Sequence, residues 1–270
     1  MEALGQIDAW PVARAAVGVA RAGAIVAVRG AVNERFPWAS VTKPVTALAV
    51  LVAAEEGILE LDEAAGPPGS TVRNLLAHAS GLPFEGERPI GRPGERRIYS
   101  NTGFAVLGTL VAERAEMSFA DYVHAAVAEP LGLDAVLRGD PGSGLEGTLA
   151  DLLAVGRQLL APAVVAAETL AEATSVQFPG LDGVLPGFGR QSPNDWGLGF
   201  ELRDAKRPHW TGSRNSPRTF GHFGQTGAFL WVDPEAGLAC ACLADRDFGD
   251  WAREAWPAFS DAVLAEAAAL

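Results

Sequence analysis

The sequence predicts an α+β fold in which a sheet formed by both ends of the chain is interrupted by an inserted all-helical domain. Apolar segments rich in β-branched residues, typical of strands, occur near the N-terminus and again after Trp196. In the middle of the chain the apolar residues recur with a helical period. This order predicts a discontinuous sheet domain over residues 1–65 and 195–270 and a helical domain over residues 66–194.

The N-terminal strands are expected to form a hairpin. Residues 12–32 are small, apolar and β-branched, and Arg21-Ala-Gly23 interrupts them. This pattern predicts that residues 15–20 pair with residues 24–28. An apolar helix follows and meets Gly57, which can adopt the left-handed conformation that ends a helix.

The middle of the chain is expected to fold into helices joined by Gly/Pro-rich loops. Start signals occur at Ser70, Ser118 and Thr148, and stop signals occur at Pro130 and Pro162. The predicted helices cover residues 71–78, 101–115, 118–128, 148–160 and 163–173. These segments make up the inserted domain of the predicted fold.

Strand patterns return in the C-terminal part and are followed by a closing helix. The turn Asp233-Pro-Glu-Ala-Gly237 separates the last two strands. A helix over residues 250–268 directs its large apolar side chains to one face. The predicted strands cover residues 197–202, 220–223, 228–232 and 238–244.

The composition excludes several classes of partner. The formal net charge of −12 and the pI near 4.8 argue against nucleic acid and anionic membranes, because an acidic surface is repelled by both. The N-terminus has no signal-peptide pattern, and no segment has the roughly twenty consecutive apolar residues of a membrane helix. We therefore expect a cytoplasmic protein without a membrane segment, and we predict no particular oligomeric state.

Cysteine and histidine positions give no metal-binding pattern. Cys240 and Cys242 alternate with alanines and would share one face of a strand, which favours reduced, structural thiols over a disulfide. The histidines are scattered, and we interpret His78 as a structural contact at the domain junction. We expect neither a metal nor any other cofactor, because no ligand spacing is present.

The most informative stretch is Trp-Ala-Ser-Val-Thr-Lys-Pro-Val, residues 38–45, where the apolar helix begins. Ser40 and Lys43 would share one helix face, with the hydroxyl in reach of the amine. A buried lysine can lose its proton near neutral pH because burial penalises the ammonium form. Only Lys43 and Lys206 are lysine among the 21 basic residues. The pair predicts a nucleophile and its base; the structural alternative is a helix cap beside a solvated lysine.

Two further motifs accompany this pair. Tyr99-Ser-Asn101 precedes a predicted helix, and Gly221-His-Phe-Gly-Gln-Thr-Gly227 coincides with a predicted strand. Together with Ser40-Val-Thr-Lys43 they resemble the three active-site motifs of the serine β-lactamase and penicillin-binding-protein superfamily, and most closely its class C-like branch of esterases and peptidases. Residues 73–83 and 196–200 resemble two further family segments. The resemblance covers most of the chain and implies an antiparallel sheet flanked by helices with an inserted helical domain.

The resemblance also implies a role for each motif residue. Tyr99 would face the Ser40–Lys43 pair, where a cation lowers its pKa and lets it relay protons. Asn101 would contact a substrate carbonyl and also cap its helix. His222 occupies a position where many relatives have lysine, and would bind the tyrosine or a substrate oxygen without a permanent charge at pH 7. The structural alternatives are a packed loop aromatic for Tyr99 and a structural histidine for His222.

The backbone of the third motif is expected to contact the substrate as well. Gly224 would let a substrate lie close against the strand. The backbone N–H groups of Ser40 and Gln225 would form an oxyanion hole for the developing negative charge.

These residues predict a cofactor-free serine hydrolase that cleaves a small-molecule ester or amide through an acyl-enzyme. Carboxylesterase activity is favoured because a neutral His222 attracts a substrate carboxylate less strongly than lysine does. The alternative within the family is a β-lactamase, a DD-peptidase or a D-aminopeptidase. The alternative of another class is a non-catalytic member that binds a ligand in the same cleft.

Overall fold

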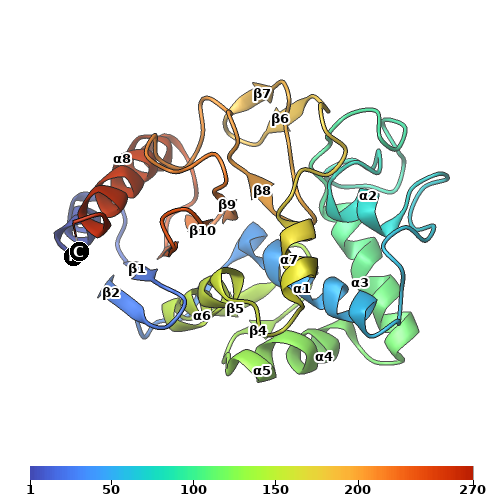
Figure 1. Cartoon of the computed structure of the whole chain (residues 1–270), viewed down its shortest axis with the longest axis horizontal. Coiled ribbons are helices and arrows are strands. Elements are labelled where there is room, and N and C mark those ends of the chain that lie inside the picture. Colours follow the sequence, from blue (N-terminus) through green and yellow to red (C-terminus); the bar gives the residue numbers. More distant parts are fainter. Residues whose placement is uncertain (270) are drawn as a thin grey trace.

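A computed structural model describes residues 1–269 and contains a six-stranded sheet to which both chain ends contribute (Figure 1). Neighbouring strands are antiparallel, and β1 pairs with both β2 and β11, so the N-terminal hairpin continues into the C-terminal strands. The order is β2-β1-β11-β10-β9-β8, with β1 Ala15–Ala20, β2 Ile25–Gly30, β8 Glu201–Leu202, β9 Phe220–Gly224, β10 Ala228–Asp233 and β11 Leu238–Ala244. The predicted α+β class is confirmed; the two domain boundaries stay a prediction.

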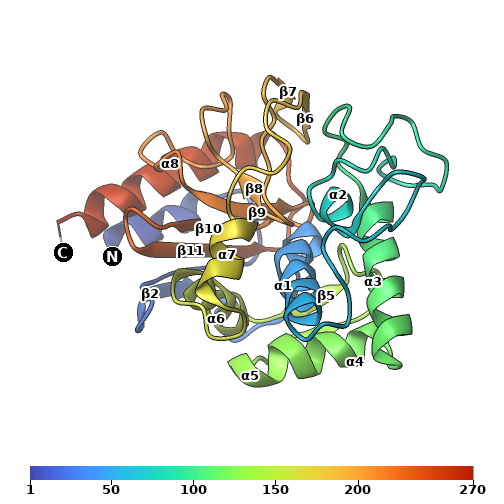
Figure 2. The same cartoon turned by 45° about the vertical axis from the view of Figure 1, so that its right-hand side comes forward.

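The inner strands β1, β9, β10 and β11 are buried throughout, so both faces of the sheet are covered there, whereas the edge strand β2 is largely exposed. Side chains alternate between the two faces along each strand. On β10, Leu230 belongs to one apolar core, whereas Phe229 and Trp231 belong to the other. Cys240 and Cys242 are free thiols in this second core, as expected. Figure 2 shows α8 and the N-terminal helix lying together on the second face, with α1 and α6 on the opposite side. The bounds are η1 Glu2–Ala9 (a 3-10 helix), α1 Thr42–Glu55, α6 Leu149–Leu160 and α8 Asp250–Ala267.

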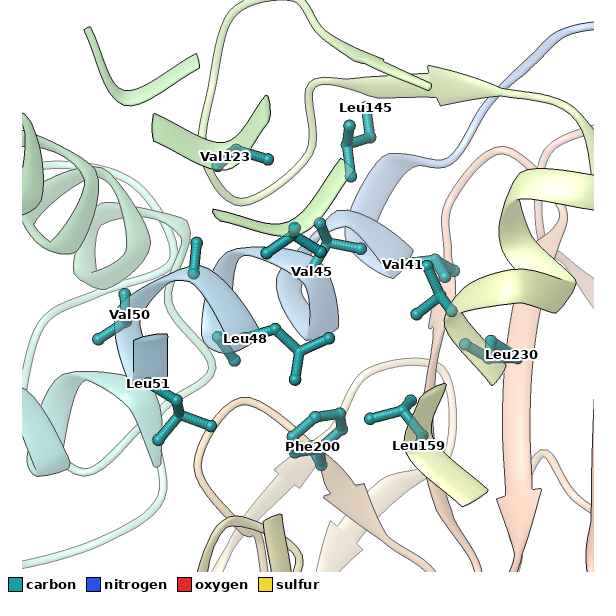
Figure 3. Packing of buried hydrophobic residues seen from close by; sticks show 14 of the residues in the cluster. Val41, Val45, Leu48, Val50, Leu51, Val123, Leu145, Leu159, Phe200 and Leu230 are labelled. Carbon is teal, nitrogen blue, oxygen red and sulfur yellow. The ribbon is translucent and has the colours of Figure 1, made fainter. Parts of the chain in front are cut away.

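Helix α1 passes through the centre of the molecule. Every residue from Thr42 to Ala53 is buried, which is the pattern of a helix enclosed on all sides. Figure 3 shows Val45 and Leu48 extending from this helix into the apolar core. The 3-10 turn η2 (Ala39–Val41) precedes it and carries Ser40. The candidate nucleophile is therefore attached to a helix that is enclosed along most of its length.

The remaining elements are short. The helix over 101–115 is confirmed, but the helix predicted to stop at Pro130 continues to Leu131 and ends at Gly132, which has a φ of 64°. No helix within residues 1–269 is long and apolar enough to cross a membrane. These elements are β3 Phe36–Pro37, α2 Val72–Leu76, α3 Asn101–Ala115, α4 Phe119–Val123, the π-helical turn η3 His124–Ala128, α5 Glu129–Leu131, β4 Val136–Leu137, β5 Leu145–Gly147, α7 Ala167–Ala173, β6 Gly183–Leu185 and β7 Gly189–Gln191.

The strand predicted over residues 197–202 is wrong in its first part, because only β8 forms there. The Gly197 N–H donates to the Phe200 carbonyl, and Gly199 has a φ of 83°, so this segment is a turn. A Cβ at Gly199 would lie 2.3 Å from the Cβ of Ala47 on α1. Close contact with the central helix therefore takes precedence over the strand pattern.

Candidate active site

Ser40 lies in a strained turn where α1 begins. Ala39 has a φ of 45°, a left-handed conformation that is unfavourable for a residue with a Cβ. The end of β9 packs against this turn: a Cβ at Gly224 would lie 2.4 Å from the Trp38 carbonyl oxygen and 3.2 Å from the Ser40 nitrogen. Gly224 is thus required for the approach of β9 to the nucleophile turn, a role that the sequence did not predict. A direct substrate contact at Gly224 stays a prediction.

The Lys43 amine is fully buried and has three oxygen neighbours. Its Nζ lies 2.6 Å from Asn101 Oδ1, 2.9 Å from the Gly142 carbonyl oxygen and 3.4 Å from Ser40 Oγ. A neutral amine has two N–H donors and one lone pair. Because Asn101 Oδ1 and the Gly142 carbonyl can only accept, they fix both donors, and the lone pair is left for the Ser40 hydroxyl proton.

Burial makes this amine a base near neutral pH. It lowers the pKa of Lys43 from 10.5 to about 7, and the nearby Asp140 carboxylate opposes part of that change. The rings of Tyr99 and Phe104 enclose the amine, with centroids 4.7 and 5.3 Å from Nζ. The expected loss of the Lys43 proton near neutral pH therefore agrees with its environment.

Tyr99 and His222 meet in front of this pair. Burial lowers the pKa of His222 to about 3, helped by the charge of Lys43, so the imidazole is neutral as expected. Its Nδ1 lies 2.6 Å from the Phe223 carbonyl, which only accepts, so Nδ1 carries the proton. The bare Nε2 then accepts from the Tyr99 hydroxyl at 3.4 Å. This tautomer fixes the direction of the Tyr99 O–H.

The expected lowering of the Tyr99 pKa is wrong. Burial raises the pKa of Tyr99 above its ordinary value, and the nearby Ser40 hydroxyl opposes only part of that rise. The physical reason is that the enclosed site penalises the phenolate, while Lys43 is itself close to losing its charge. Tyr99 is therefore suited to pass a proton on rather than to stand as an anion.

His78 holds the segment that carries Tyr99. Its carbonyl accepts from the Ile98 N–H, and its Nδ1 accepts from the Ser100 N–H at 3.1 Å, so it binds the backbone on both sides of Tyr99. The ring centroids of His78 and Tyr99 are 4.6 Å apart, and the His78 ring also packs edge-on against Trp196. The structural role of His78 is confirmed, and its place at a domain junction stays a prediction.

Asn101 does not cap its helix, because Ser100 takes that role. The Ser100 hydroxyl accepts from the Gly103 N–H at 2.9 Å, which makes Ser100 the N-cap of α3. Asn101 is the first helical residue, and its side chain binds Lys43 instead. The predicted cap is therefore wrong, and the predicted contact to substrate stays a prediction.

The backbone groups predicted to bind an oxyanion lie close together. Ser40 is in the 3-10 turn η2 that leads into α1, where N–H groups lack acceptors within the helix. Gln225 follows Gly224 directly, and Gly224 is the strand residue packed on the Ser40 nitrogen. Ser40 and Gln225 both line the same cavity. The oxyanion hole itself stays a prediction that this arrangement favours.

The cavity beside Ser40 has a volume of about 570 Å³. Tyr99, His222 and Gln225 line it close to Ser40, and these residues form its catalytic end. Most of its other lining is apolar and comes from segments far apart in the sequence, namely Phe84, Ile90, Ile98, Val184, Leu185, Pro186, Trp196 and Phe223. Within residues 1–269, His, Cys, Asp and Glu side chains form no cluster suited to a metal ion.

Two features of the site were not predicted from the sequence. The Gly142 carbonyl reaches Lys43 because Thr46 on α1 donates to the Pro141 carbonyl and Thr42 accepts from the Leu145 N–H. Neither contact has a sequence signal beyond a Gly/Pro-rich loop.

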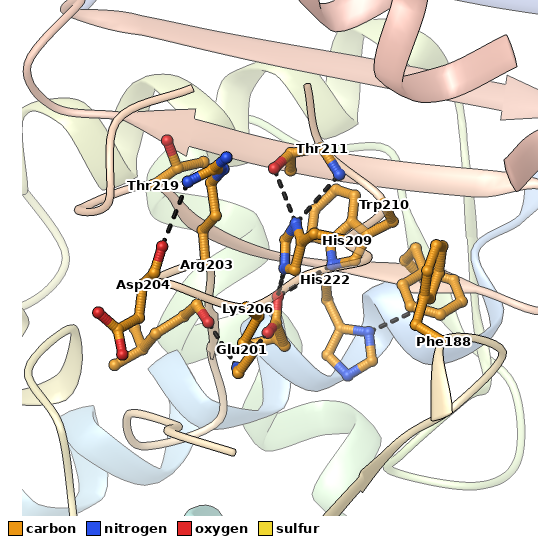
Figure 4. A network of polar contacts seen from close by, with 12 residues as sticks. Phe188, Glu201, Arg203, Asp204, Lys206, His209, Trp210, Thr211, Thr219 and His222 are labelled. Atoms are coloured by element: carbon orange, nitrogen blue, oxygen red, sulfur yellow. Dashed lines mark hydrogen bonds and ion pairs between the residues drawn. The ribbon is translucent and has the colours of Figure 1, made fainter. Parts of the chain in front are cut away.

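The second feature is a buried network around Glu201 (Figure 4). Glu201 accepts from Lys206, His209 and Trp210. Burial alone would raise the pKa of Glu201, but His209 and Lys206 outweigh it and hold the pKa at about 2. The sequence gives no pattern that predicts this network; Lys206 stands out there only as one of two lysines.

Comparison with known proteins shows to which family the chain belongs and which solved structures share its fold. The model of the Beta-lactamase family matches residues 4–264. A beta-lactamase from Mycobacterium bovis is 55% identical, with a TM-score of 0.97 over 98% of this chain and 99% of that one. EstCE1, a hydrolase with promiscuous acyltransferase activity, is 18% identical, with a TM-score of 0.78 over 97% of this chain and 96% of that one, and supports the fold alone.

A shorter match comes from Penicillin-binding protein 4* of Bacillus subtilis, which is 30% identical over 135 residues. This match covers 38% of the chain and 30% of that relative. The family match, by contrast, extends over nearly the whole chain and includes all three motifs around Ser40. The chain therefore belongs to the beta-lactamase family of serine hydrolases.

Proposed function

We propose that the protein is a carboxylesterase-type serine hydrolase that acts through an acyl-enzyme. The observation that carries this proposal is the geometry of Lys43: two acceptor-only oxygens bind its N–H groups, and its lone pair is left for the Ser40 hydroxyl. A pKa of about 7 keeps a large share of this amine neutral at physiological pH. An intact nucleophile and base argue against a non-catalytic member of the family.

In the first half-reaction, Lys43 takes the hydroxyl proton while Ser40 Oγ bonds to the substrate carbonyl carbon. The N–H groups of Ser40 and Gln225 bind the oxyanion. The carbon–oxygen bond to the leaving alcohol then breaks as Tyr99 gives its proton to the departing oxygen. Tyr99 regains a proton that originates on the Lys43 ammonium, so the site ends with a neutral amine, a phenol and an acylated serine.

In the second half-reaction, water replaces the alcohol and follows the same route in reverse. Its proton passes through Tyr99 and Lys43 as its oxygen bonds to the acyl carbon. The bond between Ser40 Oγ and that carbon breaks, the serine regains its proton and the acid is released. Tyr99 shuttles a proton in both halves, which fits a phenol whose pKa is raised above its ordinary value.

An uncharged ester is favoured over a β-lactam because of His222. A lysine at this position would offer a full positive charge to a substrate carboxylate, worth about 1–4 kcal/mol for a close pair. Burial instead holds the pKa of His222 at about 3, so it offers none at neutral pH. An uncharged ester does not need that charge.

The second candidate is a β-lactamase or penicillin-recognising peptidase, and Arg96 favours it. This exposed guanidinium lines the cavity and is a cation that could attract a substrate carboxylate. If Arg96 serves this role, Arg96→Gln would lower kcat/KM for a penicillin at least tenfold and leave that for p-nitrophenyl butyrate within twofold, about 1.4 and 0.4 kcal/mol respectively.

The test combines labelling with a substrate comparison. A fluorophosphonate probe should label the protein on the peptide that contains Ser40, and Ser40→Ala should abolish both labelling and hydrolysis of p-nitrophenyl butyrate. Equal rates for wild type and Ser40→Ala would end the proposal of a serine nucleophile. Wild-type kcat/KM should be higher for p-nitrophenyl butyrate than for nitrocefin, and the reverse order would favour the second candidate.

A further inference from the structure

Exposed apolar side chains gather at the mouth of the cavity beside Ser40. Phe84, Ile90 and Val184 are 50%, 55% and 59% exposed, and all three line the cavity. They come from the loop before α3 and from the β6–β7 hairpin, two segments that the fold brings to one opening. Exposed apolar residues that cluster at a concave site indicate a ligand surface.

The inner wall is apolar as well. Leu185 and Trp196 are almost fully buried and line the cavity beneath the mouth, and Phe223 adjoins the catalytic end next to His222. An apolar surface therefore extends from the mouth to the reacting serine. Its volume of about 570 Å³ lies within the range of about 300–1,000 Å³ typical of small-molecule sites and exceeds the space that an acetyl group needs.

The buried charged residues of the lining have their hydrogen-bonding groups occupied. Glu201 is bound by Lys206, His209 and Trp210. The Arg97 guanidinium donates to the carbonyl groups of Ala77, Gln177, Phe178 and Asn194. Glu201 and Arg97 are therefore already paired within the protein, and neither is available to bind a charged group of the substrate in the cavity interior. The exposed Arg96 at the mouth donates to the Ile90 carbonyl and helps to hold the rim.

We propose that this cavity binds a bulky, uncharged apolar substituent of the ester, at least the size of a hexyl chain, and that Val184 and Ile90 determine this preference. The inference rests on the proposed esterase function and specifies its substrate class. The substituent belongs either to the acyl group or to the alcohol, because both are attached to the carbonyl that Ser40 attacks. An apolar acyl group and an apolar alcohol group would bind through the same kind of contacts, and the experiment below distinguishes them.

The experiment measures kcat/KM for two ester series below their aggregation concentrations. One series varies the acyl chain of p-nitrophenyl esters from acetate through butyrate and hexanoate to octanoate. The other varies the alcohol of acetate esters from ethyl to octyl. Each fully buried methylene contributes up to about fourfold in kcat/KM, equal to about 0.8 kcal/mol. We expect at least a tenfold rise, about 1.4 kcal/mol, along one series, and the series that rises identifies the part of the ester that the cavity binds.

Rim variants test whether the cavity is the origin of the preference. In Val184→Ser and Ile90→Ser, the ratio of kcat/KM for the longest ester to that for acetate should fall at least threefold, because the substituent loses an apolar contact. The matched control is Val136→Ser, a similarly exposed valine on β4 that does not line the cavity. This control should leave the ratio unchanged.

The outcomes separate the inference from the function on which it rests. If no ester is hydrolysed and the fluorophosphonate does not label Ser40, the proposed function fails. If short esters are hydrolysed but kcat/KM is flat along both series, only the apolar-substituent inference fails. A rise with chain length that Val184→Ser and Ile90→Ser leave intact would also overturn it, because the preference would then arise elsewhere.

Discussion

A buried lysine that is neutral in the folded protein should make stability depend on pH in a defined window. The amine titrates with a pKa of about 7 in the native state and 10.5 when exposed, because burial penalises the ammonium form. Lys43→Met removes this titration and keeps a side chain of similar length. The difference in unfolding free energy between wild type and Lys43→Met therefore isolates the contribution of one amine.

The direction of this pH dependence follows from the number of protons that the folded and unfolded states bind. Between pH 7 and 10.5 the unfolded chain holds the Lys43 proton and the folded chain does not, so wild-type stability rises with pH relative to Lys43→Met. The gap of about 3.5 between the two pKa values corresponds to about 5 kcal/mol in total. Between about pH 7 and about pH 9.5 the expected change is about 3 kcal/mol, and below about pH 6 the difference becomes constant.

Only this pH-dependent part is predicted, because Met also leaves Asn101 Oδ1 and the Gly142 carbonyl without their donor. That loss shifts the difference by a constant of about 1–3 kcal/mol for each unpaired buried group. Urea denaturation of both proteins across the pH range measures the difference directly. Ser40→Ala is the control, since it keeps Lys43 and should retain the wild-type slope. Parallel curves for wild type and Lys43→Met would refute a neutral Lys43.

Further predictions concern the same site. Lys43→Arg should hydrolyse p-nitrophenyl butyrate nearly as poorly as Lys43→Ala, because a guanidinium keeps its proton at every working pH; an active arginine variant would reduce Lys43 to a fixed charge. Wild-type kcat/KM should rise with pH and level off above about 7 as Lys43 loses its proton, and a profile flat across this range would contradict its role as base. Glu201→Gln should lower the unfolding free energy by about 3–5 kcal/mol in urea denaturation, because Lys206 stays buried without its partner, whereas the exposed control Glu85→Gln should change little.

Much of the fold was predictable because its signals are local. The sequence over residues 101–115 has a helical period and a start signal, and the helix forms over those residues. Residues 238–244 are apolar and lie between a turn and a loop, and they form β11. The errors occur where distant parts of the chain meet. Gly199 turns because it packs against α1, and this contact leaves no local pattern.

In the site, too, local motifs were predictable and contacts between distant segments were not. Short motifs indicated Ser40, Lys43 and Tyr99, and the fold brings these three residues together. The Tyr99 pKa could not be predicted correctly, because it depends on burial by side chains from distant segments, such as His78 and Trp196. The Asn101 cap was mistaken because Ser100, its neighbour, satisfies the same helix end.

What makes Lys43 a base is supplied mostly from outside its own motif. The Gly142 carbonyl reaches the amine from a loop that Thr42 and Thr46, one on each side of Lys43 along α1, help to hold in place. The Phe104 ring and the Asn101 oxygen come from α3 and close the site around the same nitrogen. Without this enclosure, the lysine of a Ser-x-x-Lys motif would keep a pKa near 10.5. It would stay protonated at neutral pH and could not accept a serine proton. The chemistry of the motif is therefore a property of the tertiary fold, which is why Lys43 titration in the folded protein is the measurement closest to the mechanism.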